Sequence, residues 1–178
     1  LSLLIKGAFG NTEYIGYTLY FTTNFIFTGL AVAIAFHCGL FNIGGEGQAY
    51  IGGLGVGLVA LTIGHWSPFF VILISIFASM VFGAAWSFIP AVLQAKRGSH
   101  IVITTIMFNF LAAALMTYLL VEVLIEPNQQ APHSREFHPN SWLPYIHEIM
   151  HLVNIQFSPS SLNFSFIISI ITSILIWF

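Results

Sequence analysis

Long apolar runs separated by short polar breaks dominate the chain and predict membrane-spanning helices. Most of the runs approach or exceed the ~20 residues that a helix needs to cross a bilayer. Strands of alternating polarity, which are typical of membrane β-barrels, do not appear. We therefore expect an all-α, polytopic transmembrane helix bundle with about five visible spans. These spans occupy about residues 14–41, 49–63, 69–93, 101–125 and 162–178.

The most unusual break lies between the first two runs, at residues 42–48, and combines three glycines with two amides and a carboxylate. Lipid offers no hydrogen bonds, so loose backbone and a carboxylate persist at membrane depth only where protein or water surrounds them. One interpretation is a functional break on a transport path, and the other is a short polar turn at the membrane surface. The first predicts a path formed by Asn42, Gly44, Gly45, Glu46, Gly47, Gln48 and Asn109.

Asn109 joins this set because an amide in the fourth run would be costly against lipid, so its helix face should look into a bundle or a wet cavity. We expect Glu46 to be enclosed by protein, where it accepts backbone hydrogen bonds or pairs with a cation. Two patterns of small residues predict helix packing. They are the GxxxG pair Gly53 and Gly57, and the stripe Ser75, Ser79, Gly83 and Ser87.

The polar loop after the third run indicates the orientation of the chain. Lys96 and Arg97 are two of the four basic residues, and the positive-inside rule then makes this loop cytoplasmic. Gly98 should end the incoming helix and Ser99 should cap the next one. Val102 and its apolar neighbours give that helix an apolar surface, which is either embedded in headgroups, docked on a partner or part of a plain turn. By parity, residues 126–161 form an extracytoplasmic loop with a short surface helix.

Composition supports a membrane protein and excludes several other classes. The chain is 57% hydrophobic and 6% charged, with a mean hydropathy of +0.90, whereas soluble domains carry about 25% charge. A net charge of −2 excludes a nucleic-acid footprint. The single cysteine, Cys38, excludes an internal disulfide. Because the chain starts without Met and ends inside an apolar run, we expect residues 1–178 to be one transmembrane domain that is incomplete at both ends.

A zinc-protease motif is the sharpest enzyme signal in the chain. His147, Glu148 and His151 match H-E-x-x-H, which on a helix places two zinc ligands on one face beside a general base. A metalloprotease is therefore an alternative function, although the chain contains no Asp for the later motif that intramembrane zinc proteases use. The candidate third ligands are Glu122, Glu126, His133 and His138.

The glycine cluster is not a nucleotide site, because no Lys-Ser/Thr pair follows Gly47. Active transport would thus draw its energy from a partner or from an ion gradient, with His37 or Glu46 as the proton-carrying candidates in the second case. We expect no cofactor.

Two long stretches resemble a known family. Residues 28–48 read TGLAVAIAFHCGLFNIGGEGQ, and residues 95–109 read AKRGSHIVITTIMFN. Together, in this order, they are similar to the permease subunits of simple-sugar and nucleoside ABC importers, a group that includes ribose and branched-chain amino-acid permeases. The resemblance covers most of residues 4–118 and, more loosely, the rest. Ile101 departs from the family, which often has Glu there, and the His-rich outer helix is not a family feature.

The resemblance implies a non-catalytic permease of the bacterial plasma membrane that moves a nucleoside or simple sugar inward. It implies a second permease subunit, cytoplasmic ABC ATPase subunits that hydrolyse ATP, and an extracytoplasmic solute-binding protein. The ATPase would contact the loop after the third span. In this chain that loop maps to Lys96, Arg97, Gly98, Ser99, His100, Val102 and Thr104.

Overall fold

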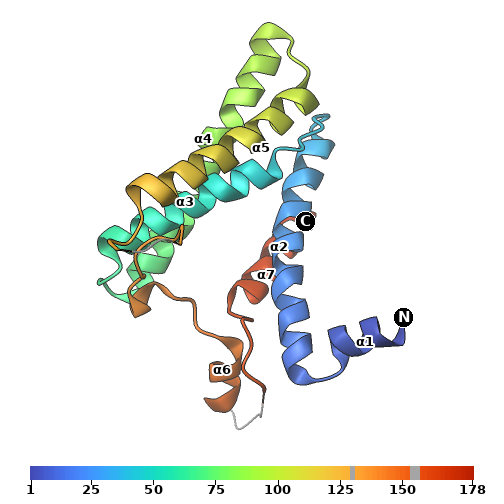
Figure 1. Cartoon of the computed structure of the whole chain (residues 1–178). Coiled ribbons are helices and arrows are strands. Elements are labelled where there is room, and N and C mark those ends of the chain that lie inside the picture. Colours follow the sequence, from blue (N-terminus) through green and yellow to red (C-terminus); the bar gives the residue numbers. More distant parts are fainter. Residues whose placement is uncertain (129–130, 153–156) are drawn as a thin grey trace. The chain divides into compact units, whose positions relative to one another are not determined.

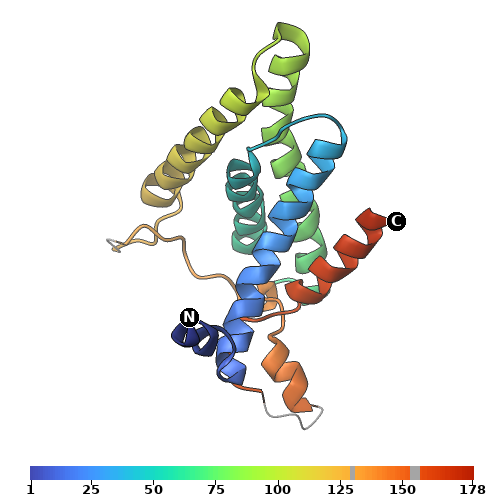
Figure 2. The same ribbon diagram turned by 90° about the vertical axis from the view of Figure 1, so that its right-hand side faces the viewer.

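The computed structural model describes residues 1–128, 131–152 and 157–178, and within them the chain is helical (Figures 1 and 2). The described residues form no strand, and their only β-type pairings are two isolated bridges, Ile125 with Ser134 and Tyr145 with Asn163. The all-α prediction is therefore confirmed. The α-helices are α1 (Ser2–Phe9), α2 (Thr12–His37), α3 (Gly45–Ile63), α4 (Pro68–Arg97), α5 (Ile101–Tyr118), α6 (Ile146–Leu152) and α7 (Ser165–Trp177).

Two short non-α turns complete the described helices. A π-turn at Leu119–Val123 continues α5, and a 3₁₀ turn at Pro139–Ser141 precedes α6. Three of the described helices are long and apolar enough to cross a membrane: α2, α4, and α5 together with its π-turn. Helix α3 is long enough but too rich in glycine and polar residues to count as apolar, and α7, with 13 residues, is apolar but too short.

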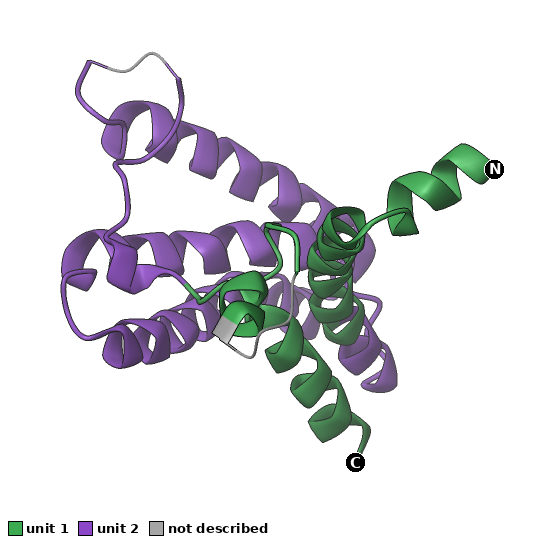
Figure 3. Ribbon diagram, turned by 90° about the horizontal axis from the view of Figure 1, so that it is seen from below, with its two compact units in different colours: residues 1–31, 143–178 green, residues 32–142 purple. Residues whose placement is uncertain are grey.

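The chain divides into two compact units, shown in different colours in Figure 3. The terminal unit contains residues 1–31 and 143–178, and the central unit contains residues 32–142. In the terminal unit the Thr12 and Ser158 hydroxyls lie 2.6 Å apart, and Ile146 N–H donates to Leu162 O at 2.9 Å. The short helix α6 lies within residues 126–161, the segment for which a surface helix was expected; its place relative to a membrane stays a prediction. Residues 129–130 and 153–156 of that segment lie outside the described residues.

In the central unit, α3 packs against both α4 and α5 (Figure 1). Gly52 and Gly55 make the contact with α4: a Cβ on Gly52 would lie 3.0 Å from Ser79 Oγ, and one on Gly55 would lie 3.0 Å from Ala78 O. The prediction that Gly53 and Gly57 form the packing contact was wrong for the described residues. A Cβ on Gly53 would meet nothing within 4 Å, and one on Gly57 would meet only the ring of Phe137, at 3.8 Å. The Ser79–Gly83 part of the stripe on α4 does face α3, since a Cβ on Gly83 would lie 3.6 Å from Gln48 O.

Candidate functional site

The glycine-rich break forms the entry to α3, and its own side chains shape that entry. Asn42 Oδ1 accepts a hydrogen bond from Gly44 N–H at 2.8 Å, which is the local turn that Asn favours. Gln48 N–H donates to Gly44 O at 3.0 Å and makes the first helical bond of α3. The amides just before Gln48 then have no intrahelical carbonyl to bond, as at the start of any helix.

Asn109 on α5 hydrogen-bonds to the backbone of the break at two points, one before its first glycine and one at its last. Its Oδ1 accepts from Gly47 N–H at 2.9 Å, and its Nδ2 donates to Ile43 O at 3.0 Å. One carboxamide thus satisfies an orphan donor of α3 and a carbonyl of the preceding loop. This agrees with the expectation that the Asn109 face of α5 looks into the protein rather than toward lipid.

Two of the glycines allow this contact by bringing the backbone close to α5. Gly44 and Gly47 are buried. A Cβ on Gly47 would lie 2.9 Å from Asn109 Oδ1 and 3.1 Å from Phe108 O, and one on Gly44 would lie 3.3 Å from Thr105 Cβ. A Cβ on Gly45 would meet nothing within 4 Å, so this glycine has no packing role in the described residues.

The depth of the break along α5 follows from these contacts. Helix α5 begins at Ile101, and the break touches it at Thr105 and Asn109. At 1.5 Å per residue these positions lie roughly 6 and 12 Å from the start of the helix. The break therefore lies one to two turns away from the basic loop that joins α4 to α5.

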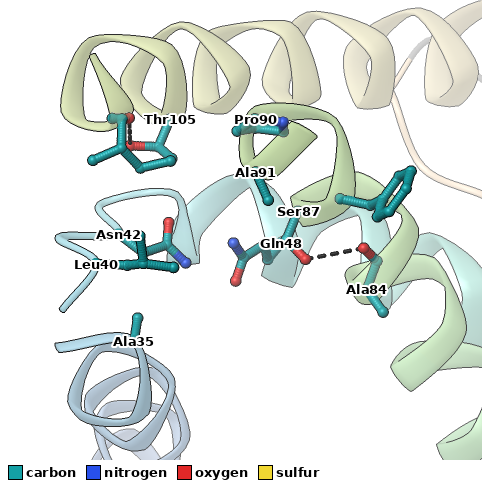
Figure 4. Close-up of a pocket in the computed structure, with 11 residues that line it drawn as sticks. Ala35, Leu40, Asn42, Gln48, Ala84, Ser87, Pro90, Ala91 and Thr105 are labelled. Atoms are coloured by element: carbon teal, nitrogen blue, oxygen red, sulfur yellow. Dashed lines mark hydrogen bonds between the residues drawn. The ribbon is translucent and has the colours of Figure 1, made fainter. Parts of the chain in front are cut away.

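A pocket of about 340 Å³ opens beside the break (Figure 4). Asn42 and Gln48 contribute its amides, and Figure 4 shows the Gln48 side chain extending into the space between Asn42 and Ser87. None of its lining residues carries a charge. They are Ala35, Leu40, Asn42, Gln48, Ala84, Ser87, Phe88, Pro90, Ala91, Ile101 and Thr105. The structure thus brings two of the predicted path residues to one pocket, and it directs Asn109 to the backbone instead.

Glu46 differs from our expectation. We expected a carboxylate enclosed by protein, but Glu46 is exposed on the first turn of α3. Its carboxylate makes no hydrogen bond or ion pair with the described residues. The reason is geometric: Gly44 and Gly47 are the positions that lie against α5, and Glu46 between them is left exposed.

The basic loop turns at Gly98, as predicted. Gly98 has φ 66° and ψ 22°, the left-handed conformation that glycine adopts at helix ends, and its N–H donates to Gln94 O at 3.0 Å. The predicted Ser99 cap was wrong. His100 occupies the N-cap position of α5 without a side-chain cap bond, and Ser99 Oγ is buried with no partner among the described residues.

The residues predicted to contact an ATPase surround this turn. Lys96, Arg97, Gly98 and His100 are exposed, and Val102 and Thr104 are half-buried. Ile103 next to them is 62% exposed, so the first turn of α5 carries the apolar surface that the sequence indicated.

The zinc motif lies on α6, but the described residues do not gather a metal site around it. No group of three or more His, Cys, Asp or Glu side chains in the described ranges is arranged to hold a metal ion. His147 and His151 belong to the terminal unit, whereas all four candidate third ligands belong to the central unit. The His147 ring stacks on Tyr145 with centroids 5.4 Å apart.

Comparison with known proteins identifies the family. Residues 14–178 match the family described as "Branched-chain amino acid transport system / permease component". The chain belongs to this permease family. It is 32% identical to the guanosine ABC transporter permease protein of Bacillus subtilis over 99% of the chain and 48% of that protein. It is 38% identical to the nucleoside ABC transporter permease protein of Lactococcus lactis over 66% of the chain and 32% of that protein.

A third relative extends the range of solutes named among similar proteins. The glucose ABC transporter permease protein of Haloferax volcanii is 38% identical over 67% of the chain and 31% of that protein. The chain spans about half or less of the length of these relatives. No solved structure shows a significant match. The family and the three apolar helices make this permease a multi-pass protein of the bacterial plasma membrane, as the resemblance implied.

The sequence indicated the break, its amides and Asn109, but it did not predict the hydrogen-bond partner of each side chain. Trp86 was missed entirely. Its indole N–H donates to Phe108 O at 3.3 Å and braces α5 from α4 beside the break. A lone Trp inside an apolar run gives no signal of such a contact, because lipid and protein neighbours suit its ring equally well.

Proposed function

We propose that this permease forms part of an ABC importer that moves a neutral nucleoside or simple sugar inward, with ATP hydrolysed on a separate subunit. The observation that carries the proposal is similarity along 99% of the chain to a permease named for guanosine, including the glycine-rich break. The permease itself is non-catalytic in this scheme.

The chemistry of the break supports a neutral solute. The pocket beside it has amide, hydroxyl and apolar groups and no charged residue in its lining. Amides and hydroxyls hydrogen-bond to sugars and nucleobases, whereas an amino acid would bring two charges that this pocket does not pair. Its volume of about 340 Å³ is within the range of small-molecule sites.

The basic loop supports an ATPase contact. Exposed Ile103 and half-buried Val102 lie directly beside exposed Lys96, Arg97 and His100. An exposed apolar first turn that directly follows a basic loop suits helix-in-groove recognition by a partner protein. By the positive-inside rule this partner is cytoplasmic. A second permease subunit and an extracytoplasmic solute-binding protein complete the proposed assembly.

Reconstitution of the full-length permease into proteoliposomes with its ATPase and binding protein tests the proposal. We expect ATP-dependent accumulation of labelled guanosine or glucose, and none of labelled leucine. An ATPase carrying a Walker-motif Lys→Ala substitution is the control and should abolish uptake.

Two results would overturn the proposal. Uptake that persists with the inactive ATPase and collapses when a protonophore is added would indicate a gradient-driven transporter. Accumulation of leucine in place of either neutral solute would retain the ABC mechanism and refute the solute class.

A further inference from the structure

We propose that Asn109 is a positioning residue: it fastens the glycine-rich break to α5, so that a displacement of the loop end of α5 is carried to the solute path. The inference rests on the proposed function, because it concerns how the loop and the path of that transporter are connected. It also makes the role of Asn109 more specific than the one that the sequence indicated, which was a place on the transport path.

The hydrogen bonds of Asn109 explain why it does not contact solute. Its oxygen and its nitrogen each bond to backbone of the break, at 2.9 Å to Gly47 N and 3.0 Å to Ile43 O. Asn109 is half-buried and is not among the residues that line the pocket. A carboxamide that satisfies backbone groups on both sides of a loop holds the loop's conformation, and releasing it to solute would leave those groups unpaired.

The break and α5 are closely packed where they meet. A methyl group has no room on Gly47, because Asn109 Cα and Phe108 O would each lie 3.1 Å from it. The same Phe108 carbonyl also accepts a hydrogen bond from Trp86 of α4 at 3.3 Å, and the Trp86 ring packs on the Phe108 ring with centroids 5.3 Å apart. Next to Asn109, helix α5 is therefore in contact with both α3 and α4.

Helix α5 is stiff enough to transmit a displacement. It contains neither Gly nor Pro from Ile101 to Tyr118, so nothing in its sequence marks a hinge. The exposed Ile103 at its loop end lies six positions before Asn109, roughly 9 Å along the axis. A shift of the first turn thus moves the Asn109 carboxamide, and with it Gly47 and Ile43.

The first test measures the connection itself by hydrogen–deuterium exchange of the full-length permease in nanodiscs, in the absence of solute and ATPase. Asn109→Leu retains the branched shape and removes both hydrogen bonds. We expect exchange of the amides at 44–48 to rise about tenfold, since the Gly47 amide has lost its acceptor. Asn109→Asp keeps an acceptor for Gly47 and should stay near wild type at that amide.

Thr117→Val is the matched control on the same helix. The Thr117 hydroxyl donates within α5, to Ala113 O at 2.9 Å, so its loss should leave exchange at 44–48 unchanged. Unchanged exchange in Asn109→Leu, or an equal rise in Thr117→Val, would overturn the proposed connection. Neither result depends on whether the protein imports a nucleoside.

The second test separates positioning from solute contact in the reconstituted transporter. For Asn109→Leu we expect the KM for solute to stay within about twofold of wild type, while solute moved per ATP hydrolysed falls about tenfold. We also expect exchange at 44–48 to depend on the ATP state in the wild type and to lose this dependence in the variant. A KM raised about tenfold with an unchanged ratio of solute to ATP would assign Asn109 to the solute and refute the positioning role.

Discussion

The indole of Trp86 on α4 donates to the carbonyl oxygen of Phe108 on α5 at 3.3 Å, and the two rings pack edge to face. Phe108 O also lies within 3.1 Å of the position that a Cβ on Gly47 would occupy. Three helices therefore meet at one peptide group, one residue away from Asn109. This meeting point explains why the break before α3 has a defined conformation despite its glycines.

Removal of the Trp86 hydrogen bond should weaken the central unit. Trp86→Phe keeps an aromatic ring against Phe108 and loses the donor, so we expect a loss of about 0.5–1.5 kcal/mol in unfolding free energy. Trp86→Ala also loses the ring contact and should cost about 3 kcal/mol. Thermal unfolding in detergent measures both. Trp66→Phe is the control, because among the described residues the Trp66 ring packs only on the ring of adjacent His65. A loss equal to that of Trp86→Phe would contradict the assignment.

Gly47 and Gly45 should respond oppositely to the same substitution. Gly47→Ala places a methyl group against Asn109 and the Phe108 carbonyl, and we expect a destabilisation of about 1–3 kcal/mol. Gly45→Ala meets nothing within 4 Å and gains helix propensity, so it should be neutral or stabilising by up to about 1 kcal/mol. Unfolding temperatures of the two variants compare them directly, and equal temperatures would refute the close approach of Gly47 to α5.

The left-handed turn at Gly98 should tolerate Asn better than Ala. An L-residue with a Cβ in this conformation costs roughly 1–2 kcal/mol, and Asn is penalised less because it bonds locally. We expect Gly98→Ala to lower stability by about 1 kcal/mol and Gly98→Asn by less, as measured by thermal unfolding. Gly29→Ala, inside α2 with open space around it, serves as the control and should not destabilise.

Loss of the Glu46 charge should affect transport and leave stability almost unchanged. The carboxylate is exposed, so Glu46→Gln should change unfolding free energy by less than about 0.5 kcal/mol. We expect solute uptake to fall at least about threefold, because the charge lies on the first turn of α3 beside the proposed path. Uptake assays on Glu46→Gln and Glu46→Ala decide the matter; normal uptake in both would make Glu46 a simple turn residue.

A charge at Val102 should release the ATPase. Val102 lies in the first turn of α5, where a carboxylate is compatible with the helix, so Val102→Glu should fold. Burying one aliphatic side chain is worth about 1.5–3 kcal/mol, and its replacement by a charge should weaken ATPase binding by tenfold or more. Co-purification and uptake measure this, with Val102→Ile as the apolar control. Wild-type co-purification of Val102→Glu would show that this turn is not the contact.

The sequence predicted the helix ends and turns of the central unit closely. Helix α3 ends at Ile63 and α4 begins at Pro68, on either side of the expected turn, and Gly98 is left-handed as its position required. These features are local: Pro and Gly restrict or free the backbone whatever surrounds them. The glycine-rich break was found for the same reason.

Features that depend on neighbours were predicted less well. Periodicity correctly indicated that α3 has a packing face of glycines, but Gly52 and Gly55 form it instead of Gly53 and Gly57. Small-residue spacing says which residues share a face and not which face a second helix covers. Ser99 failed as a cap because α5 starts one residue later than the capping pattern implied.

The hydroxyl pair of Thr12 and Ser158 has a consequence for biosynthesis. The contacts of α3 with α4 and α5 join segments that leave the ribosome in succession, so that bundle can assemble while the chain is still growing. Thr12 must wait for a partner 146 positions later. At 5–20 residues per second this delay lasts about 7–30 s. During that interval Thr12 lacks this partner, so the contact between residues 1–31 and 143–178 forms later than the bundle of α3, α4 and α5.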